Sequence, residues 1–251
     1  MSQVLEKIRK QMVAAIADYQ MLSHDDRVLV AVSGGKDSAI LLLLLNEVRS
    51  RAPFPFTIVP VMLDQKQPGF DAERFSAWIK EKTEMDLLIL EEDTYSIVKD
   101  KVAAGKSFCG LCSRLRRGVL YNYAHEQGFT KIALGHHRDD LNETLLLNLW
   151  FNGSIASMPP KLLSDDGRNM VIRPLAYVAE ASLEEAASQL ELPVIPCNLC
   201  GSQENLQRAR IKRMLKDMSA DFPAMGASML KAQQNVRKSQ LADKNLWSFD
   251  F

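Results

Sequence analysis

The chain carries no net charge and no long apolar run. Over its 251 residues, 31 Lys and Arg balance 31 Asp and Glu. An extended basic coat for nucleic acid is therefore excluded, although local basic clusters can still occur. No apolar stretch is long enough to span a bilayer, so we expect no membrane association.

The sequence also lacks internal repeats and low-complexity linkers, and it has only four cysteines. Its length suits one large domain or two small ones, and such a chain folds without disulfides or metals. Residues 1–19 combine apolar residues at helical spacing with acidic Glu6 and Asp18. This pattern predicts an amphipathic helix and not a secretion signal, so we expect a cytoplasmic protein.

Short β-branched segments alternate with helical segments along most of the chain. Strands are expected at 27–32, 56–63, 86–91, 131–135 and 170–175. Helices are expected at 37–49, 71–83, 113–128, 139–150 and 182–190, and over most of the chain from 204 onward. This alternation predicts an α/β fold, a Rossmann-like parallel sheet with helices on both faces.

A glycine-containing loop follows the first strand and opens a helix. Its residues are Ser33, Gly34, Gly35, Lys36, Asp37 and Ser38. Adjacent glycines let backbone amides approach phosphate oxygens, and the helix N-terminus, Lys36 and the Ser38 hydroxyl add charge and donors. Asp37 beside phosphates needs a cation between them, which indicates Mg²⁺. The alternative is a glycine turn that merely caps a helix. We predict that the loop binds ATP.

A second strand-end loop follows the strand at 131–135. It contains Gly135, His136, His137, Arg138, Asp139 and Asp140. Taken alone, the two histidines are ordinary loop residues. Because strand ends of a parallel sheet meet at one edge, this loop is expected beside the first one, and its acids suit Mg²⁺. We favour His136 over His137 as a site residue.

The four cysteines form two widely separated C-x-x-C pairs, Cys109 with Cys112 and Cys197 with Cys200. In a cytosolic chain such pairs indicate metal or redox chemistry more readily than structural disulfides. Spacing alone is compatible with a tetrahedral zinc site on all four cysteines, with an iron–sulfur cluster or with dithiol redox chemistry.

Basic residues follow each cysteine pair. The first cluster is Arg114, Arg116 and Arg117, and the second is Arg208, Arg210, Lys212, Arg213 and Lys216. Lys106 and Lys161 lie in neighbouring loops. Such clusters can be solvated helix faces, but two of them flanking the cysteines favour an RNA-binding surface.

The stretch AVSGGKDS resembles the PP-loop of the N-type ATP pyrophosphatases, and its spacing differs from that of a Walker A loop. That family cleaves ATP between the α- and β-phosphates and transfers AMP to an acceptor. The resemblance implies an adenine nucleotide alpha hydrolase-like fold. It implies three parts: an N-terminal helix (1–24), a PP-loop ATP pyrophosphatase domain (25–195) and a C-terminal helical segment with the second cysteine pair (196–251).

Within that family, nearly the whole chain is similar to the tRNA 2-thiocytidine synthetases. The similar stretches are VLVAVSGGKDS, LDQKQPGF, FCGLCSRLRRG, KIALGHHRDD, GSIASMPPKLLSDDG, IRPLAY and PCNLCGSQENLQR. Members bind a [4Fe–4S] cluster on three cysteines and thiolate a cytidine at tRNA position 32. The resemblance implies Cys109, Cys112 and Cys200 as cluster ligands. Spacing leaves open whether Cys197 replaces Cys200.

The resemblance also implies roles for further residues. Lys36 and Asp37 act in catalysis with the three cysteines, and Asp37 holds Mg²⁺. ATP contacts Ser33, Gly34, Gly35, Lys36, Asp37, Ser38, Leu63, Gly135, His136 and Asp140. RNA contacts Arg114, Arg116, Arg117, Arg208 and Arg213. Expected partners are tRNA, a sulfur donor such as a cysteine desulfurase, and a second copy of the chain in a homodimer.

Two other functions fit the same motifs less fully. One is a different PP-loop sulfurtransferase or amide-forming enzyme. The other is a non-enzymatic nucleotide-binding module with a structural zinc ion on the four cysteines, which would be colourless and release no pyrophosphate.

Overall fold

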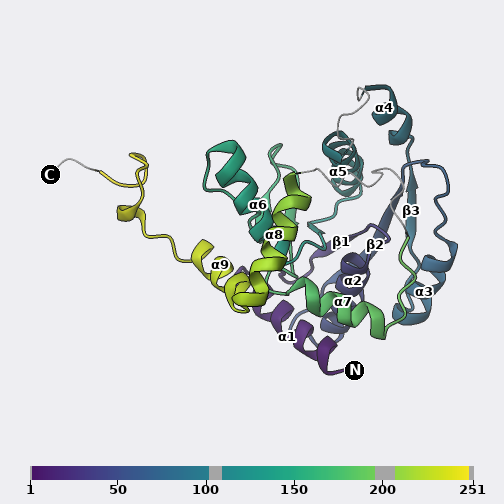
Figure 1. Cartoon of the computed structure of the whole chain (residues 1–251). Helices are drawn as coiled ribbons and strands as arrows, with labels where there is room; N and C mark the ends of the chain where they lie inside the picture. The colour runs from purple at the N-terminus through teal and green to yellow at the C-terminus, as the bar shows by residue number, and fades with distance from the viewer. Residues whose placement is uncertain (1, 102–108, 196–206, 249–251) are drawn as a thin grey trace.

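The computed structural model describes residues 2–101, 109–195 and 207–248. Over these ranges the chain forms a six-stranded sheet in the order β3-β2-β1-β4-β6-β5 (Figure 1). The strands are β1 Arg27–Val32, β2 Thr57–Asp64, β3 Leu88–Glu91, β4 Lys131–Ala133, β5 Lys161–Leu163 and β6 Met170–Ile172. The Rossmann-like α/β fold predicted from the sequence is confirmed.

Helices connect the strands and extend beyond them. They are α1 Gln3–Asp18, α2 Lys36–Arg51, α3 Glu73–Thr83, α4 Thr94–Lys101, α5 Cys109–Glu126, α6 Arg138–Leu147, α7 Glu180–Gln189, α8 Gln207–Asp221 and α9 Met225–Gln233. A π-helical turn, η1 Asn148–Asn152, continues α6, and a 3₁₀ turn, η2 Lys238–Gln240, lies in the tail. Among the described residues, no helix is both long and apolar enough to cross a bilayer.

The sheet is parallel except at one edge, where the strand β5 was not expected from the sequence. β5 pairs antiparallel with β6, and the other strand pairs are parallel. A tight turn joins β5 to β6: the Gly167 amide donates to the Ser164 carbonyl at 2.7 Å, and Gly167 has φ +70°. A strand of three residues has too little periodicity to be predicted from the sequence.

Helices cover both faces of the sheet, and β1 is therefore buried on both. Val28, Val30 and Val32 point into the larger core cluster with residues of α1, α2 and α7. Leu29 points the other way and packs against Leu120 of α5. A strand that is buried on both faces has a nearly continuous apolar sequence, and this feature predicted β1 from the sequence.

The strand order places the switch point between β1 and β4. β1 pairs on one side with β2 and on the other with β4, both parallel. In open α/β sheets the crevice at such a point is where ligands bind. The loops at 33–38 and 135–140 leave these two strands and therefore lie at the same crevice.

Two helices differ from the sequence prediction. The helix expected at 113–128 begins at Cys109, so both cysteines of the first pair belong to its first turn and do not precede it. The helix α4 was not expected, because its short span carries little periodicity. Asp93 stabilises its start by accepting hydrogen bonds from the Ser96 amide and hydroxyl, at 3.0 and 2.8 Å.

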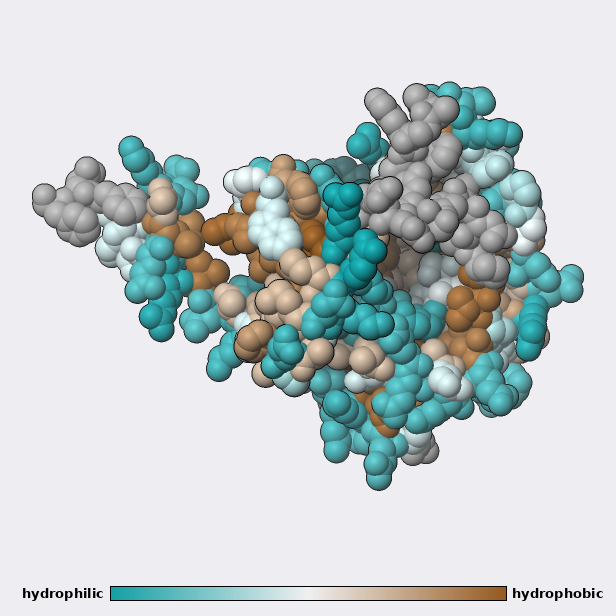
Figure 2. All heavy atoms as spheres, in the orientation of Figure 1, coloured by the Kyte–Doolittle hydropathy of each residue, from teal (hydrophilic) through white to brown (hydrophobic). Residues whose placement is uncertain are grey.

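The C-terminal part lies against α6. Helices α8 and α9 both contact α6, and the segment after α9 projects away from the body (Figure 1). Apolar surface appears on this projecting tail in Figure 2, and Val236, Leu246 and Trp247 are exposed there.

Candidate active site

A cavity of about 340 Å³ opens at the ends of β1 and β4. Its lining includes the following residues predicted for ATP: Ser33, Asp37, Ser38, Leu63, Gly135, His136 and Asp140. Val32, Leu120 and Leu134 add apolar walls. A volume of this order with apolar walls and a few convergent polar groups is typical of a small-ligand site.

The phosphate loop is built by its glycines and serines. Gly34 has φ +81°, a left-handed conformation that favours glycine. The Ser38 hydroxyl donates to the Gly35 carbonyl at 3.0 Å and accepts from the Ser33 amide at 3.0 Å. Gly35 is the N-cap of α2 and has no side chain to occupy the first amides of the helix. Those amides and the helix dipole form an anion-binding site.

The segment that leads to the second cysteine pair touches this loop. The Ile195 amide donates to the Gly34 carbonyl at 2.9 Å. A Cβ on Gly34 would lie 2.9 Å from the Cβ of Ile195. Ile195 is the last described residue before the range 196–206, and it lies directly against the phosphate loop.

The second loop approaches the first so closely that only glycine fits at its start. A Cβ on Gly135 would lie 3.0 Å from the Ser38 amide nitrogen and 3.1 Å from the Asp37 carbonyl carbon. These are backbone atoms of the phosphate loop and cannot turn aside. The two loops therefore depend on each other for their positions.

Gly135→Ala is expected to destabilise the chain by about 1–3 kcal/mol, because the new methyl group overpacks this contact. It should also weaken Mg–ATP binding by displacing the loop at 33–38. Thermal unfolding with and without Mg–ATP measures both effects. Gly118→Ala is the matched control: its Cβ meets nothing within 4 Å in α5, so alanine should stabilise the helix by roughly 0.5–1 kcal/mol. Equal melting temperatures for Gly135→Ala and the unmodified protein would contradict the contact.

The two histidines of the second loop have different places. His137 is the N-cap of α6, where its backbone amide donates to Asp140 Oδ2 at 3.0 Å and its Nδ1 accepts from the Asp140 amide at 3.4 Å. Its side chain is buried. His136 lines the cavity instead, and its Nδ1 is buried without a hydrogen-bond partner among the described residues. The arrangement supports the preference for His136 as the residue that meets a ligand.

Burial lowers the pKa of His136 to about 4, and the positive charges of Arg173 and Arg208 act in the same direction. The imidazole is therefore neutral at pH 7. Its Nδ1 is available to a bound ligand, and the neutral ring adds no charge to a site that already contains several charged side chains.

Acid should destabilise the chain through His136. Between pH 6.5 and about 4 the unfolded chain binds a proton at this residue and the folded chain does not. The free energy of unfolding therefore falls with falling pH, by up to ~3 kcal/mol. Urea unfolding of His136→Asn should show a flatter dependence over this range. An identical slope in variant and parent would contradict the assignment.

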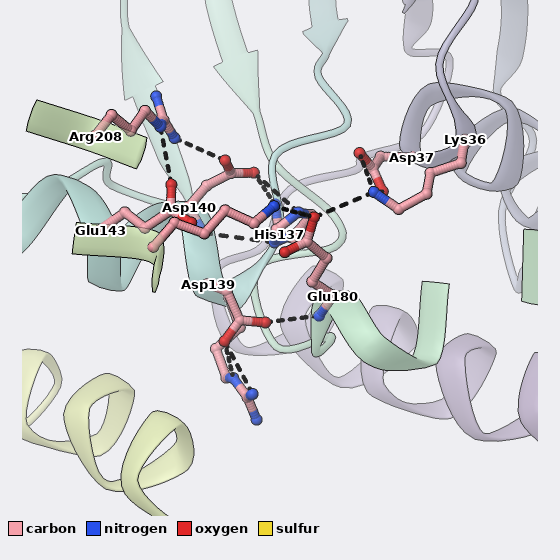
Figure 3. Close-up of polar contacts among 10 residues, drawn as sticks. Lys36, Asp37, His137, Asp139, Asp140, Glu143, Glu180 and Arg208 are labelled. Carbon is pink, nitrogen blue, oxygen red and sulfur yellow. Dashed lines mark hydrogen bonds and ion pairs between the residues drawn. The ribbon is translucent and has the colours of Figure 1, made fainter. Parts of the chain in front are cut away.

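An ion pair connects the phosphate loop to Glu180 of α7, and Glu180 in turn contacts α8 and α6 (Figure 3). The Lys36 ammonium lies 3.3 Å from Asp37 Oδ1 and 3.2 Å from Glu180 Oε1. The Lys212 ammonium of α8 donates to the same Glu180 oxygen at 2.6 Å. The Glu180 amide in turn donates to Asp139 Oδ2 at 2.6 Å, which holds the start of α7 against the start of α6.

The charges at these residues follow from burial and from their partners. Burial raises the pKa of Asp37, with Lys36 opposing it. Burial also acts to raise the pKa of Glu180, but the Lys212 hydrogen bond and the Lys36 charge leave it below its ordinary value. Asp37 Oδ1 is buried and makes no hydrogen bond in the described structure, although Lys36 is near. A buried carboxylate oxygen of this kind suits a Mg²⁺ ion bound with ATP phosphates.

The first cysteine pair lies on the helix that walls the cavity. Ser113, Arg116 and Arg117 of α5 line it. Cys112 is buried, and its Sγ donates to Gln65 Oε1 at 3.2 Å. Nothing is described of the Cys109 side chain, and Cys197 and Cys200 lie outside the described residues. Of the four cysteines, the described residues therefore place only the Cys112 side chain, on the helix whose Ser113, Arg116 and Arg117 line the cavity.

Comparison with known proteins agrees with this geometry. Residues 4–218 match the family model described as PP-loop domain. A tRNA-cytidine(32) 2-sulfurtransferase of Bdellovibrio bacteriovorus is 53% identical over 97% of this chain and 93% of its own length. One from Coxiella burnetii is 51% identical over 98% of this chain and 96% of its own. The chain belongs to the tRNA-cytidine(32) 2-sulfurtransferase family.

Solved structures of a tRNA thiolase and of an NAD synthetase share the fold. The chain is similar to the U34-tRNA thiolase NcsA from Methanococcus maripaludis, solved with its [4Fe–4S] cluster, with a TM-score of 0.73 and 19% identity over 92% of this chain and 78% of that one. It is also similar to an NH3-dependent NAD synthetase from Campylobacter jejuni, with a TM-score of 0.50 and 16% identity over 97% and 98%. At these identities the likeness supports the fold alone.

In this member of the 2-sulfurtransferase family, the predicted RNA-binding arginines are not equivalent. Arg116 and Arg117 line the ATP cavity, and Arg114 is exposed on α5. Arg213 is exposed on α8. Arg208 instead donates to Asp140 Oδ1 at 2.7 Å and to Glu143 Oε2 at 2.8 Å.

Sequence reasoning missed Glu180 and gave Lys212 a different role. Glu180 follows β6 at the same sheet edge and opens α7, so its position after a strand was the signal that could have found it. Lys212 was grouped with the RNA-binding residues because only the docking of α8 shows which way that helix face points.

Proposed function

We propose that this chain thiolates cytidine 32 of tRNA, using ATP to activate the base and an iron–sulfur cluster to deliver sulfur. The observation that carries the proposal is one crevice shared by the phosphate loop and by α5, the helix of the first cysteine pair, in a member of the 2-sulfurtransferase family. A protein that only binds a nucleotide would not need a cysteine pair on a helix of that crevice.

The reaction divides one difficult substitution into two easier ones. The C2 oxygen of the cytosine attacks the α-phosphorus of ATP, and pyrophosphate leaves. Sulfide sulfur then adds at C2, the C2–O bond breaks, and AMP departs with the oxygen. The chain's own part is to orient the triphosphate and to stabilise charge on the leaving group.

Each element of the crevice has a role in this scheme. The amides at the start of α2 bind phosphate oxygens together with the hydroxyls of Ser33 and Ser38, and Lys36 neutralises charge that develops on the pyrophosphate. Asp37 holds Mg²⁺. Leu63 and the other apolar walls accommodate adenosine, while neutral His136 hydrogen-bonds the ligand. An unpaired anticodon-loop base is the form of cytidine that can enter such a pocket.

Cys109, Cys112 and Cys200 would hold the cluster, which supplies sulfur to the activated base when bound. Three protein ligands leave one iron open to exogenous sulfide. Cys197 is then not a ligand. Arg114, Arg116, Arg117 and Arg213 would contact tRNA phosphates.

The further parts of the proposal concern organisation and partners. Residues 25–195 form the ATP pyrophosphatase unit, preceded by an N-terminal helix (1–24) and followed by a helical segment that bears the second cysteine pair (196–251). The protein acts in the cytoplasm as a homodimer and takes sulfur from a donor such as a cysteine desulfurase.

A nucleoside analysis tests the proposal. Protein purified without oxygen is mixed with Mg–ATP, sulfide and bulk tRNA, and the tRNA is then digested. We expect 2-thiocytidine together with equimolar AMP and pyrophosphate. Thiolated uridine in its place would indicate a different PP-loop sulfurtransferase, and a colourless zinc protein that releases no pyrophosphate would contradict the proposal altogether.

A further inference from the structure

The basic face of α8 divides into two parts with different surroundings. Arg208 and Lys212 are one helical turn apart, so their side chains leave the helix on the same side. Arg208 pairs with Glu143 and with Asp140, which lines the ATP cavity, and Lys212 pairs with Glu180. All three side chains are exposed, but Arg213, which follows Lys212, makes no ion pair among the described residues. The sequence grouped these residues as one RNA-binding cluster, whereas the fold separates them.

Glu180 brings two lysines from distant parts of the chain to one atom. Lys36 of the phosphate loop and Lys212 of α8 both bind its Oε1, at 3.2 and 2.6 Å. Glu180 is itself held, because its amide donates to Asp139 at 2.6 Å. Its side chain is largely shielded from water, at 16% exposed. Lys36 has a second carboxylate beside it, Asp37; with Asp37 on Mg²⁺ as proposed, the two ammonium groups share Glu180 alone and the pair retains positive charge.

Arg208 places a third cation at the same edge. It bridges Glu143 and Asp140, and Asp140 lines the ATP cavity. Its positive charge is felt inside the cavity, since it helps to lower the pKa of His136. Figure 3 shows Lys36, Glu180, Asp140 and Arg208 converging on one region between the phosphate loop and α8.

We propose that Lys212 and Arg208 bind the β- and γ-phosphates of ATP, and hence the leaving pyrophosphate, with Glu180 holding Lys36 and Lys212 side by side for that purpose. A triphosphate carries several negative charges, and one lysine with one helix N-terminus neutralises only part of them. Arg208 and Lys212 exchange hydrogen bonds with their carboxylate partners for charge-assisted hydrogen bonds to the phosphates. These bonds strengthen as charge develops on the leaving group. The proposal rests on the proposed function only in that ATP is the nucleotide.

Binding measurements on two variants of the same helix test this assignment. Calorimetry with Mg–ATP and with magnesium pyrophosphate measures the phosphate site, and filter binding measures tRNA. Lys212→Gln should raise the Kd for pyrophosphate and ATP by about tenfold, the effect of losing one charge-assisted hydrogen bond of about 1.4 kcal/mol. Its Kd for tRNA should stay within about twofold of the parent. Arg213→Gln, the matched control, should show the reverse.

Lys212→Arg keeps the charge and the bond to Glu180, and it should restore the pyrophosphate Kd to within about threefold of the parent. This conservative variant also keeps the test decisive if Lys212→Gln folds poorly. Unchanged pyrophosphate affinity in Lys212→Gln would overturn the proposal, as would a loss of tRNA affinity as large as that of Arg213→Gln.

The two proposals can fail separately. If the protein binds pyrophosphate through Lys212 but forms no 2-thiocytidine, the proposed function is wrong and the phosphate-binding role of Lys212 still holds. A protein that forms 2-thiocytidine and binds pyrophosphate equally well without Lys212 would remove only the assignment.

Discussion

Lys36→Met is expected to lower the rate of ATP-dependent thiolation by about 10²–10³-fold, the usual cost of removing one group that stabilises transition-state charge. The ammonium lies at the start of α2, beside Asp37 and Glu180. Its charge adds to the helix dipole at the place where pyrophosphate leaves. Methionine keeps most of the side-chain volume, so the loss should be one of charge and not of packing.

Pyrophosphate release in the presence of tRNA measures the adenylation step directly, and the yield of 2-thiocytidine measures the whole reaction. Both should fall together. Lys82→Met is the control: Lys82 is exposed on α3 and pairs only with its neighbour Glu81 among the described residues. A Lys36→Met protein that retains more than a tenth of the parent rate would contradict a catalytic role.

Cys112→Ala should abolish both the cluster and thiolation while leaving Mg–ATP binding within a few-fold. Cys112 lies on α5, whose next residue Ser113 lines the ATP cavity, but its own Sγ contacts Gln65 of the β2 end. A small buried thiol can be replaced there without disturbing the loop at 33–38. Loss of a cluster ligand removes the sulfur-delivery step and spares nucleotide binding.

Iron and sulfide content, with the visible absorption of protein purified without oxygen, reports the cluster. Cys109→Ala and Cys200→Ala should be colourless as well, and Cys197→Ala should stay brown and active. That last variant is the matched control within the second pair. A brown Cys200→Ala protein together with a colourless Cys197→Ala protein would show that Cys197, and not Cys200, is the third cluster ligand. A stoichiometric zinc ion on four thiolates would contradict the cluster.

Local signals were enough to predict much of the molecule. β1 was predicted to the residue because a strand buried on both faces is apolar throughout, and the turn into α2 needs the positive φ of Gly34. The two loops at 33–38 and 135–140 could be placed together because parallel strands share their carboxyl edge. The two-sided α/β sheet followed from the alternation of strands and helices.

Other features depend on contacts that no local pattern carries. The edge strand β5 is three residues long and is defined only by its pairing with β6. Whether a cysteine pair precedes a helix or begins it depends on the packing of α5 against the sheet. The separate places of His136 and His137 arise from the N-cap of α6, because one side chain caps the helix and the other turns into the cavity.

The sequence by itself determined the chemistry of this protein: a phosphate loop, four cysteines in two pairs and basic residues after each pair. Tertiary structure alone decided which charges serve which ligand. Arg208 and Lys212 pair with acids of α6 and α7 because α8 docks on α6, while Arg213 on the same helix makes no ion pair among the described residues. Residues far apart in the chain share an ion-pair partner only once the fold has brought them together, and Glu180 with its two lysines is the example here.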